Sequence, residues 1–290
     1  MFKSSYTIVL SMLFESVYQI RGSTGVGPFG NDWLVKIVLV GIAFLFCWYD
    51  WKTKHRTDYW SVLAWGSIIW GIAELVLQVT GIRDFAPKYI LGWEVPIWLS
   101  IPVRGIVEGG LVAVGCLFFA DRMLDPKTRK SSVIIYTLLM GVLIAAAFIR
   151  VTLEQYPGPT YGSLTVPSRR NIFAPIPVAF CIVMIGVSLF FFFSPRTPPD
   201  LRQRGILLFI LMVIFGACWT LGEWASGTRW IEVGSPNTYM HAPPAIEFWA
   251  LTWDVVVEIA FAYVPFFVFP VWKKDIKSVT IRSPNTSMNQ

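Results

Sequence analysis

The stretch AIEFWALTWDVVVEIAFAYVPFFVFP, residues 245–270, is apolar over most of its length but carries Asp254 and Glu258 near its middle. As a helix, it is long enough to cross the hydrocarbon layer of a bilayer, which is about 30 Å thick. A carboxylate at the centre of such a helix costs at least about 2.5 kcal/mol, so it normally faces other helices and marks a functional site. The stretch therefore predicts a membrane helix whose acidic side is turned into a bundle.

The whole chain has the composition of a polytopic membrane protein. It has 290 residues, of which 55% are hydrophobic and 14% are charged. A soluble domain of this length carries more charge and fewer long apolar runs. We expect an all-α membrane protein with seven transmembrane helices, at residues 33–48, 59–80, 95–120, 133–152, 172–194, 205–224 and 246–271.

The transmembrane domain is predicted to cover residues 33–272, with a shorter segment on each side. The segment before it, residues 1–32, begins with an interrupted apolar run and lacks the cleavage site of a signal peptide. We interpret residues 1–20 as an interfacial helix, with an eighth membrane span as the alternative. Residues 273–290 are polar, and we expect them to form a disordered cytosolic tail.

The basic residues predict the orientation in the membrane, because they flank every second crossing. They are Lys52, Lys54, Arg56, Arg122, Lys127, Arg129, Lys130, Arg196, Arg202, Arg204, Lys273, Lys274 and Lys277. Loops rich in lysine and arginine stay in the cytosol, so the N-terminus is expected outside and the C-terminus inside. The net charge of +6 then reflects topology and does not indicate a nucleic-acid partner. Without a cleaved signal, the endoplasmic reticulum is the expected membrane.

Two loops on the predicted outer side are long, at residues 155–171 and 225–245. Both are rich in proline, glycine and aromatic residues. This composition suits ordered caps over the mouth of a cavity better than flexible linkers.

A weak internal repeat relates the two halves of the chain. The motif WGIAE at residues 70–74 matches WTLGE at 219–223, and RGIVE at 104–108 matches DVVVE at 254–258. The two glutamates of the first half are 34 residues apart, and those of the second half are 35 apart. The pattern predicts a parallel repeat of three helices, one linker helix and three helices. Chance similarity among apolar helices is the alternative.

Charged residues inside the predicted spans point to a shared polar chamber. They are Glu74, Arg104, Glu108, Glu223, Asp254 and Glu258, from spans two, three, six and seven, and Glu247 lies on the stripe of Asp254. Residues four apart share a face of a helix, so Arg104 lies beside Glu108, and Asp254 beside Glu258. We expect these side chains to meet on the outer side of the membrane, beneath the two long loops.

Five acids around one arginine cannot all be ionised in a dry pocket, because burial and mutual repulsion both favour protonation. A buried carboxylic acid that is neutral can donate a proton, and an ionised neighbour can accept one. The alternative is a structural network in which Arg104 pairs with Asp254 or Glu108 and fastens the bundle.

Tryptophans are expected at the same depth as the acids. They are Trp70, Trp98, Trp219, Trp249 and Trp253. Aromatic faces stabilise cations by about 0.5–2 kcal/mol, most where water is excluded. Acids, aromatic walls and little water are what carbocation chemistry on a lipophilic substrate requires.

Several classes of metal and cofactor site lack their sequence signals. The only histidines, His55 and His241, lie in loops, and the cysteines Cys47, Cys116, Cys181 and Cys218 have no metal-ligand spacing. The chain has no DDxxD pair, Walker loop or GxGxxG motif, and the last span has no lysine for a retinal Schiff base. We expect neither a metal nor another cofactor.

At Trp70, Glu74 and Asp254 the chain resembles the integral-membrane terpene cyclases of fungal meroterpenoid pathways. Those seven-helix proteins carry an essential glutamate after a tryptophan in span two and an acid in the last span. The resemblance covers the helical plan but few residues. Trp70 and Glu74 are four apart here, where the family has adjacent residues, and this chain has larger outer loops.

The resemblance implies a cyclase that protonates an epoxide or alkene on a lipophilic prenylated substrate and guides cyclisation of the cation. Glu74 or Asp254 would donate the proton, and the other acid would tune it together with Glu108 and Glu258. Arg104 would keep an acid ionised or hold the polar head group of the substrate. Glu223 and the tryptophans Trp70, Trp98, Trp219, Trp249 and Trp253 would line the binding site. The resemblance identifies no protein partner.

Two other functions fit the same pattern. A proton-coupled carrier of the SWEET type also has the three-plus-one-plus-three plan and uses buried acids. Against it, Pro96 and Pro102 of span three have no counterparts in span seven, where Pro265 and Pro270 come late. A receptor or assembly factor is the third class, although span three lacks a DRY-like triplet and span seven lacks NPxxY.

Overall fold

The computed structural model describes residues 18–21, 33–84, 88–154, 168–171, 173–232, 239–240 and 244–277. Its helices are α2 (Leu34–Lys54), α3 (Asp58–Val79), α4 (Ile97–Arg104), α5 (Val112–Leu124), α6 (Arg129–Glu154), α7 (Pro175–Phe193), α8 (Pro199–Ala225), α9 (Pro244–Thr252) and α10 (Ala262–Trp272). Two π-helical segments, η1 (Gly105–Leu111) and η2 (Trp253–Phe261), join α4 to α5 and α9 to α10. With each joined helix counted once, seven helices in the described part are long and apolar enough to cross a membrane, which confirms the predicted number.

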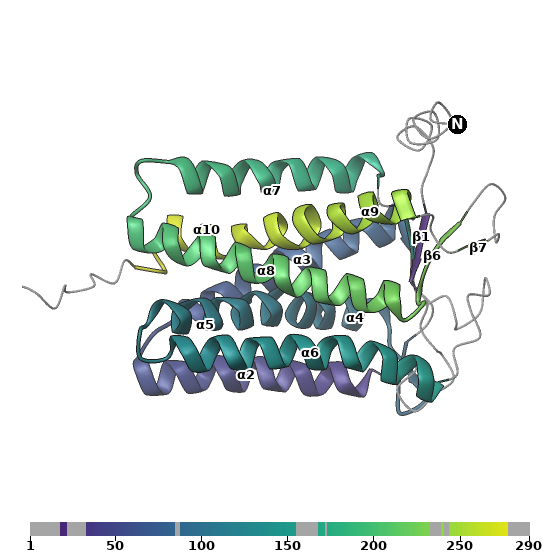
Figure 1. The fold of residues 1–290 in the computed structure, drawn as a ribbon, viewed down its shortest axis with the longest axis horizontal. Helices are drawn as coiled ribbons and strands as arrows, with labels where there is room; N and C mark the ends of the chain where they lie inside the picture. Colours follow the sequence, from purple (N-terminus) through teal and green to yellow (C-terminus); the bar gives the residue numbers. More distant parts are fainter. Residues whose placement is uncertain are drawn as a thin grey trace, which may run out of the picture.

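The long helices lie side by side in a bundle whose two ends differ (Figure 1). The short connections α2–α3, α5–α6 and α7–α8 lie at one end, together with the end of α10. The basic residues of the sequence pattern gather there, and we call it the basic end. Short strands cover the opposite end, which we call the sheet end.

The strands at the sheet end come from four separate parts of the chain. They are β1 (Tyr18–Arg21), β2 (Arg83–Asp84), β5 (Ser168–Asn171), β6 (Arg229–Glu232) and β7 (Tyr239–Met240), paired in the order β2-β5-β1-β6-β7. The pairings are antiparallel. A separate hairpin, β3 (Tyr89–Ile90) with β4 (Trp93–Glu94), lies in the connection before α4. The described parts of both long loops thus contribute strands to this sheet, and their expected role as caps over the mouth of a cavity stays a prediction.

The N-terminal segment differs from its prediction where the structure describes it. Tyr18–Arg21 is a strand between β5 and β6, so an interfacial helix that reaches residue 20 is wrong there. The reason is that two neighbouring strands satisfy its backbone groups, which outweighs the local apolar pattern. Residues 1–17 and the tail after residue 277 lie outside the described residues.

The α10 helix forms the centre of the apolar core. Its residues Val264, Phe266 and Phe267 are fully buried, and α3, α5, α7 and α8 all pack against it. Phe267 meets Phe191 of α7 edge to face, with ring centroids 5.9 Å apart. The acid-bearing η2 continues directly into α10, so the core fixes the position of the acids.

Glycines bring η1 into backbone contact with α3. A Cβ on Gly109 would lie 2.5 Å from the backbone oxygen of Gly66 and 2.5 Å from Cβ of Trp70. Small residues at such points allow membrane helices to pack closely. π-helical turns are frequent at functional sites, and η1 and η2 each carry a predicted site glutamate, Glu108 and Glu258.

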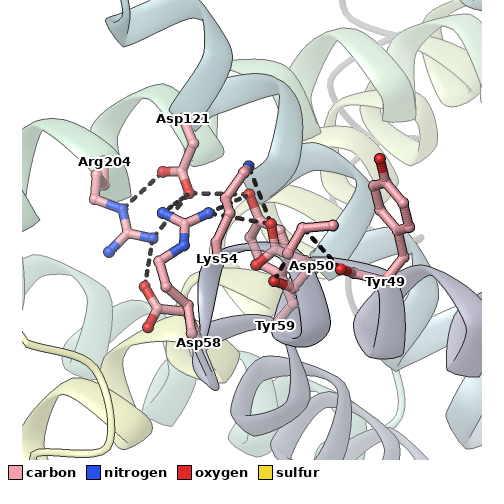
Figure 2. Close-up of polar contacts among 9 residues, drawn as sticks. Tyr49, Asp50, Lys54, Asp58, Tyr59, Asp121 and Arg204 are labelled. Carbon is pink, nitrogen blue, oxygen red and sulfur yellow. Dashed lines mark hydrogen bonds and ion pairs between the residues drawn. The ribbon is translucent and has the colours of Figure 1, made fainter.

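A network of ion pairs closes the basic end of the bundle (Figure 2). Arg204 of α8 donates to Asp121 at 2.7 Å and to Asp58 at 3.0 Å. Arg56, in the α2–α3 connection, reaches Asp50 at 3.4 Å and Asp121 at 3.9 Å. Burial acts to lower the pKa of Arg56, but the acidic groups around it raise its pKa above the usual value. Arg56 is therefore charged at neutral pH, and the network ties α2, α3, α5 and α8 together.

The close packing of η1 on α3 predicts the effect of adding one methyl group. Gly109→Ala forces backbone to move, and overpacking of this kind costs about 1–3 kcal/mol. We expect a lower Tm for the detergent-solubilised protein, measured by size-exclusion chromatography after heating. Gly115→Ala on α5 is the control, because its Cβ would meet nothing within 4 Å. Equal Tm values for the two variants would contradict the packing.

Candidate functional site

Three arginines of the sheet end enter the bundle and meet the acids of the helices. They are Arg83 of β2, Arg170 of β5 and Arg229 of β6, which are 7%, 8% and 1% exposed. Each strand thus places a cation against the ends of the membrane helices. An arginine is buried at such a place only where carboxylates neutralise it and accept its hydrogen bonds.

Arg83 holds Glu74, near the sheet end of α3. The Nη1 atom of Arg83 donates to Oε1 of Glu74, whose side chain is 1% exposed. Burial lowers the pKa of Arg83 to about 10, an effect that Glu74 opposes. The guanidinium is still protonated at neutral pH, so the contact is a buried charge-assisted hydrogen bond.

Two arginines hold Asp254 at the start of η2. Arg170 donates to Oδ1 at 2.9 Å, and Arg229 donates to Oδ2 at 2.9 Å. Arg170 also donates to Oε2 of Glu258 at 2.6 Å, and Arg229 lies 3.8 Å from Glu223. Asp254 thus joins β5 and β6 to the last membrane helix.

A third group of charges surrounds Glu108 of η1. Lys36 of α2 donates to Oε1 of Glu108, and Arg104 lies 3.4 Å from the same atom. The guanidinium of Arg104 stacks over the ring of Trp33, 4.9 Å from its centroid. Arg83 interacts electrostatically with Arg104 and Glu108, so this group is continuous with the one around Glu74.

The structure brings the predicted acids together at one end of the bundle, but it corrects their charge balance. Arg104 is not the only cation among them, because Lys36, Arg83, Arg170 and Arg229 also take part. The expectation that carboxyls must be protonated because one arginine faces five acids is therefore wrong. The pairing of Arg104 with Glu108 in the structural alternative is present, whereas Asp254 pairs with Arg170 and Arg229.

A cavity of about 140 Å³ lies beside this network, between α3, α7 and η2. Its lining consists of Trp70, Ile72, Ala73, Glu74, Val76, Leu77, Arg83, Arg170, Ile176, Pro177, Phe180, Cys181, Glu258 and Ala262. Most of these side chains are apolar. Ile72 of α3 is 57% exposed and Ile176 of α7 is 42% exposed, so the rim of the cavity lies on the apolar outside of the bundle.

Glu74 and Trp70, which line this cavity, each have a polar atom without a hydrogen-bond partner among the described residues. These atoms are Oε2 of Glu74 and Nε1 of Trp70, and both are buried. Trp70 lies one helical turn before Glu74 on α3, so the two side chains share a face. Oε1 of Glu74 accepts from Arg83, so Oε2 is the carboxyl oxygen left without a partner in the described part of the chain.

The predicted tryptophans divide into two groups. Trp70 lines the cavity, and Trp253 donates to Oε1 of Glu258 at 3.1 Å. Trp98, Trp219 and Trp249 are 70%, 41% and 57% exposed and do not line this cavity, so their expected role in shielding a cation stays a prediction. They lie on apolar outer surfaces of their helices, as lipid-facing tryptophans do. The side chain of Glu247, which was predicted on the stripe of Asp254, lies outside the part of the chain that the structure describes.

Four cations that pair with the acids were not predicted from the sequence, and only one of them could have been. Lys36 stands alone in an apolar helix, where a lysine needs a partner, so it was detectable. Arg83, Arg170 and Arg229 lie in polar loops, where an arginine is ordinarily solvated. Only the folding of these loops into a sheet brings them to the acids.

Among the described residues, no group of three or more His, Cys, Asp and Glu side chains is placed to hold a metal ion. The chemistry that the described side chains offer is proton transfer and hydrogen bonding. Comparison with known protein families, with curated proteins and with solved structures gives no match to this chain. The family resemblance therefore rests on the residues quoted above.

The pairing of Asp254 predicts a large loss of stability when one cation is removed. Arg229→Gln leaves a buried carboxylate short of its partner, which costs about 3–5 kcal/mol. We expect a marked fall in Tm and in the yield of monodisperse protein in detergent. Arg196→Gln is the control, because Arg196 is exposed at the basic end. A Tm for Arg229→Gln equal to that of the control would show that the buried pair does not hold the sheet to the bundle.

Proposed function

We propose that the protein is an intramembrane cyclase that protonates an epoxide, or an alkene, on a lipophilic prenylated substrate. The observation that carries this proposal is the position of Glu74. Glu74 lines an apolar cavity whose rim lies on the outside of the bundle. Arg83 holds one of its carboxyl oxygens, and the other is buried without a partner among the described residues. An acid in this place meets its substrate directly from the bilayer, in the near absence of water.

The proton transfer can be written with the residues of the cavity. Glu74 is a carboxylate beside Arg83 in the resting protein, so it first takes up a proton on Oε2. It then gives this proton to the epoxide oxygen as the carbon–oxygen bond breaks, and that oxygen becomes a hydroxyl. An alkene of the same chain then attacks the cationic carbon and closes a ring. Glu258 lines the same cavity and, as a carboxylate, accepts the proton that the last cation loses. The ring of Trp70 stabilises the cation.

The size of the cavity sets what enters it. An apolar cavity of about 150 Å³ binds benzene, so one of about 140 Å³ holds roughly one isoprene unit. We propose that the terminal unit of the prenyl chain enters between α3 and α7 and that the rest stays in the bilayer. Closing a ring then needs the space between α3 and α7 to widen, while both helices stay packed on α10.

We also propose that the two halves arose by duplication. Exchanging the halves maps β1 onto β5, and the β1–β6 pairing onto the β5–β2 pairing. The same exchange relates the packed pair α3 and α10 to the pair α8 and α5, and those two helices also pack against each other. The π-helical segments η1 and η2 each end three residues after their glutamates, Glu108 and Glu258. These agreements support the three-plus-one-plus-three plan.

The duplication explains why the proposed active site lies in one half. Gly222 of α8 precedes Glu223, as Ala73 of α3 precedes Glu74. A Cβ on Gly222 would lie 3.5 Å from Ala147 of α6, so the linker helix covers that face. The equivalent face of α3, at Ala73, lines the cavity instead.

Orientation and location complete the proposal. Lysine and arginine gather at the basic end, so we place that end in the cytosol and the sheet outside it. The endoplasmic reticulum is the membrane that we propose. In this orientation the cavity draws its substrate from the leaflet on the far side of the membrane.

The matched glutamates of the two halves provide the test. Glu74→Gln keeps the shape of the side chain but cannot give a proton, so we expect product formation to fall by at least about 100-fold, the usual contribution of a general acid. Glu223→Gln should keep most of the activity. The assay is mass spectrometry of products from microsomes supplied with a prenylated aromatic epoxide. Full activity of Glu74→Gln would remove the proposal.

Asp254→Asn separates a structural role from a catalytic one. Asp254 is held by two arginines and does not line the cavity. We therefore expect this variant to have a lower Tm, and the folded fraction to retain part of its turnover. A variant of normal Tm with no turnover would instead make Asp254 the proton donor.

A proton-coupled carrier is the second candidate. The observation in its favour is that buried ion pairs close the bundle at both ends, around Arg204 at the basic end and Arg170 at the sheet end. Carriers alternate between states by opening one such end at a time. Uptake of labelled sugars or prenyl compounds into vesicles under a pH gradient, without chemical change, would favour the carrier over the cyclase.

A further inference from the structure

We infer that the cavity binds the hydroxyl group of a long-chain lipid alcohol, and that such alcohols, including the product of epoxide opening, inhibit the protein. The binding part stands on the geometry alone. The inhibition part rests on the proposed function.

The unpaired donor of Trp70 and the unpaired acceptor of Glu74 match the two hydrogen bonds of a hydroxyl group. Nε1 of Trp70 is a donor only, and Oε2 of the Glu74 carboxylate is an acceptor. Both are buried without a partner in the described part of the chain. A hydroxyl oxygen accepts one hydrogen bond and donates another, so a hydroxyl placed between the two atoms would satisfy both. An ether, an epoxide or a ketone can accept from Trp70 but has nothing to donate to Glu74.

The ion pairs around the cavity favour a neutral ligand. Two arginines reach the cavity, which would suggest an anionic group such as a phosphate. However, Arg83 is bonded to Glu74, and Arg170 is bonded to Asp254 and Glu258. An anion would have to displace these buried carboxylates, so a neutral head group fits better.

Apolar side chains surround the two polar atoms. Ile72, Ala73 and Val76 of α3 face Ile176 and Phe180 of α7 across the cavity. Water could bond to the same two atoms, but an alcohol also buries its hydrocarbon chain against the apolar part of the wall and is therefore favoured over water. A hydrocarbon chain that leaves through the exposed rim at Ile72 and Ile176 keeps its remainder in lipid.

The product of the proposed reaction carries the kind of group that this site binds. Proton transfer from Glu74 turns the epoxide oxygen into a hydroxyl and leaves Glu74 as a carboxylate. The new hydroxyl then has the donor and acceptor arrangement that Trp70 and Glu74 need. The product is therefore bound better than the epoxide, and a free prenyl alcohol competes for the same place.

The binding test uses the purified full chain in phosphatidylcholine nanodiscs. Three photoreactive probes share a C15 prenyl chain with a diazirine at its far end, and they carry a hydroxyl, a methyl ether or a hydrogen at the other. We expect the alcohol to label peptides of α3 and α7 at least about tenfold more than the ether or hydrocarbon, since a satisfied buried hydrogen bond is worth about this factor. Equal labelling by all three probes would overturn the inference, because it would mark an unselective apolar crevice.

Two variants locate the hydroxyl, each with a control. Trp70→Phe removes the donor and keeps an aromatic ring, so it should lower alcohol labelling to the level of the ether, whereas Trp219→Phe at the matching place on α8 should not. Ala73→Leu should block labelling by filling the cavity, whereas Ala146→Leu on the exposed side of α6 should not. Undiminished labelling of both Trp70→Phe and Ala73→Leu would place the alcohol elsewhere and overturn the inference.

Turnover separates this inference from the proposed function. Labelling at α3 and α7 without any turnover of the epoxide would end the cyclase proposal and leave the alcohol site in place. Turnover of the epoxide without selective labelling by the alcohol would end the alcohol site and leave the cyclase proposal in place. If both are observed, we expect the C15 alcohol to inhibit turnover competitively and the hydrocarbon to leave it unchanged; no inhibition by the alcohol would overturn the regulatory part.

Discussion

The pairing of buried carboxylates with arginines that enter from the sheet end is the interaction on which the rest of the structure depends. Asp254 and Glu74 are each 1% exposed, and an ionised carboxylate in such a place is tolerated only with cations against it. The strands that carry Arg83, Arg170 and Arg229 are therefore parts of the transmembrane fold and do more than cover it. Sheet and bundle stabilise each other, because neither set of charges can be buried alone.

This pairing also separates Glu74 from the other acids. Both oxygens of Asp254 are bonded to arginines, and both oxygens of Glu258 accept hydrogen bonds. Glu74 bonds Arg83 through Oε1 only, and its second oxygen has no partner among the described residues, although Glu74 lines the cavity together with Trp70. The same network that fixes the fold thus leaves one buried oxygen of a residue that lines the cavity without a partner in the described part of the chain. The reactivity that we propose for Glu74 follows from this position and does not require an excess of acids.

The sequence predicted the parts of the structure that depend on local pattern. Hydropathy and the cost of buried charge gave the seven helices and the gathering of Glu74, Glu108, Asp254 and Glu258 at one end. The arginine partners could not be predicted, because Arg170 and Asp254 are 84 residues apart and meet only through the sheet. The tryptophans were predicted only by their depth, and depth does not decide which face of a helix a side chain occupies: Trp70 lines the cavity, whereas Trp249 is exposed.

The most direct test of the account is a double-mutant cycle on Arg83 and Glu74, read as Tm in detergent micelles. Glu74→Met and Arg83→Met each leave one buried charge, whereas the double variant leaves none and fills the space with apolar side chains. The account predicts that the double variant is more stable than either single variant. Losses that simply add would show that the two side chains do not depend on each other, and the link between the sheet and the carboxyl of Glu74 would be refuted.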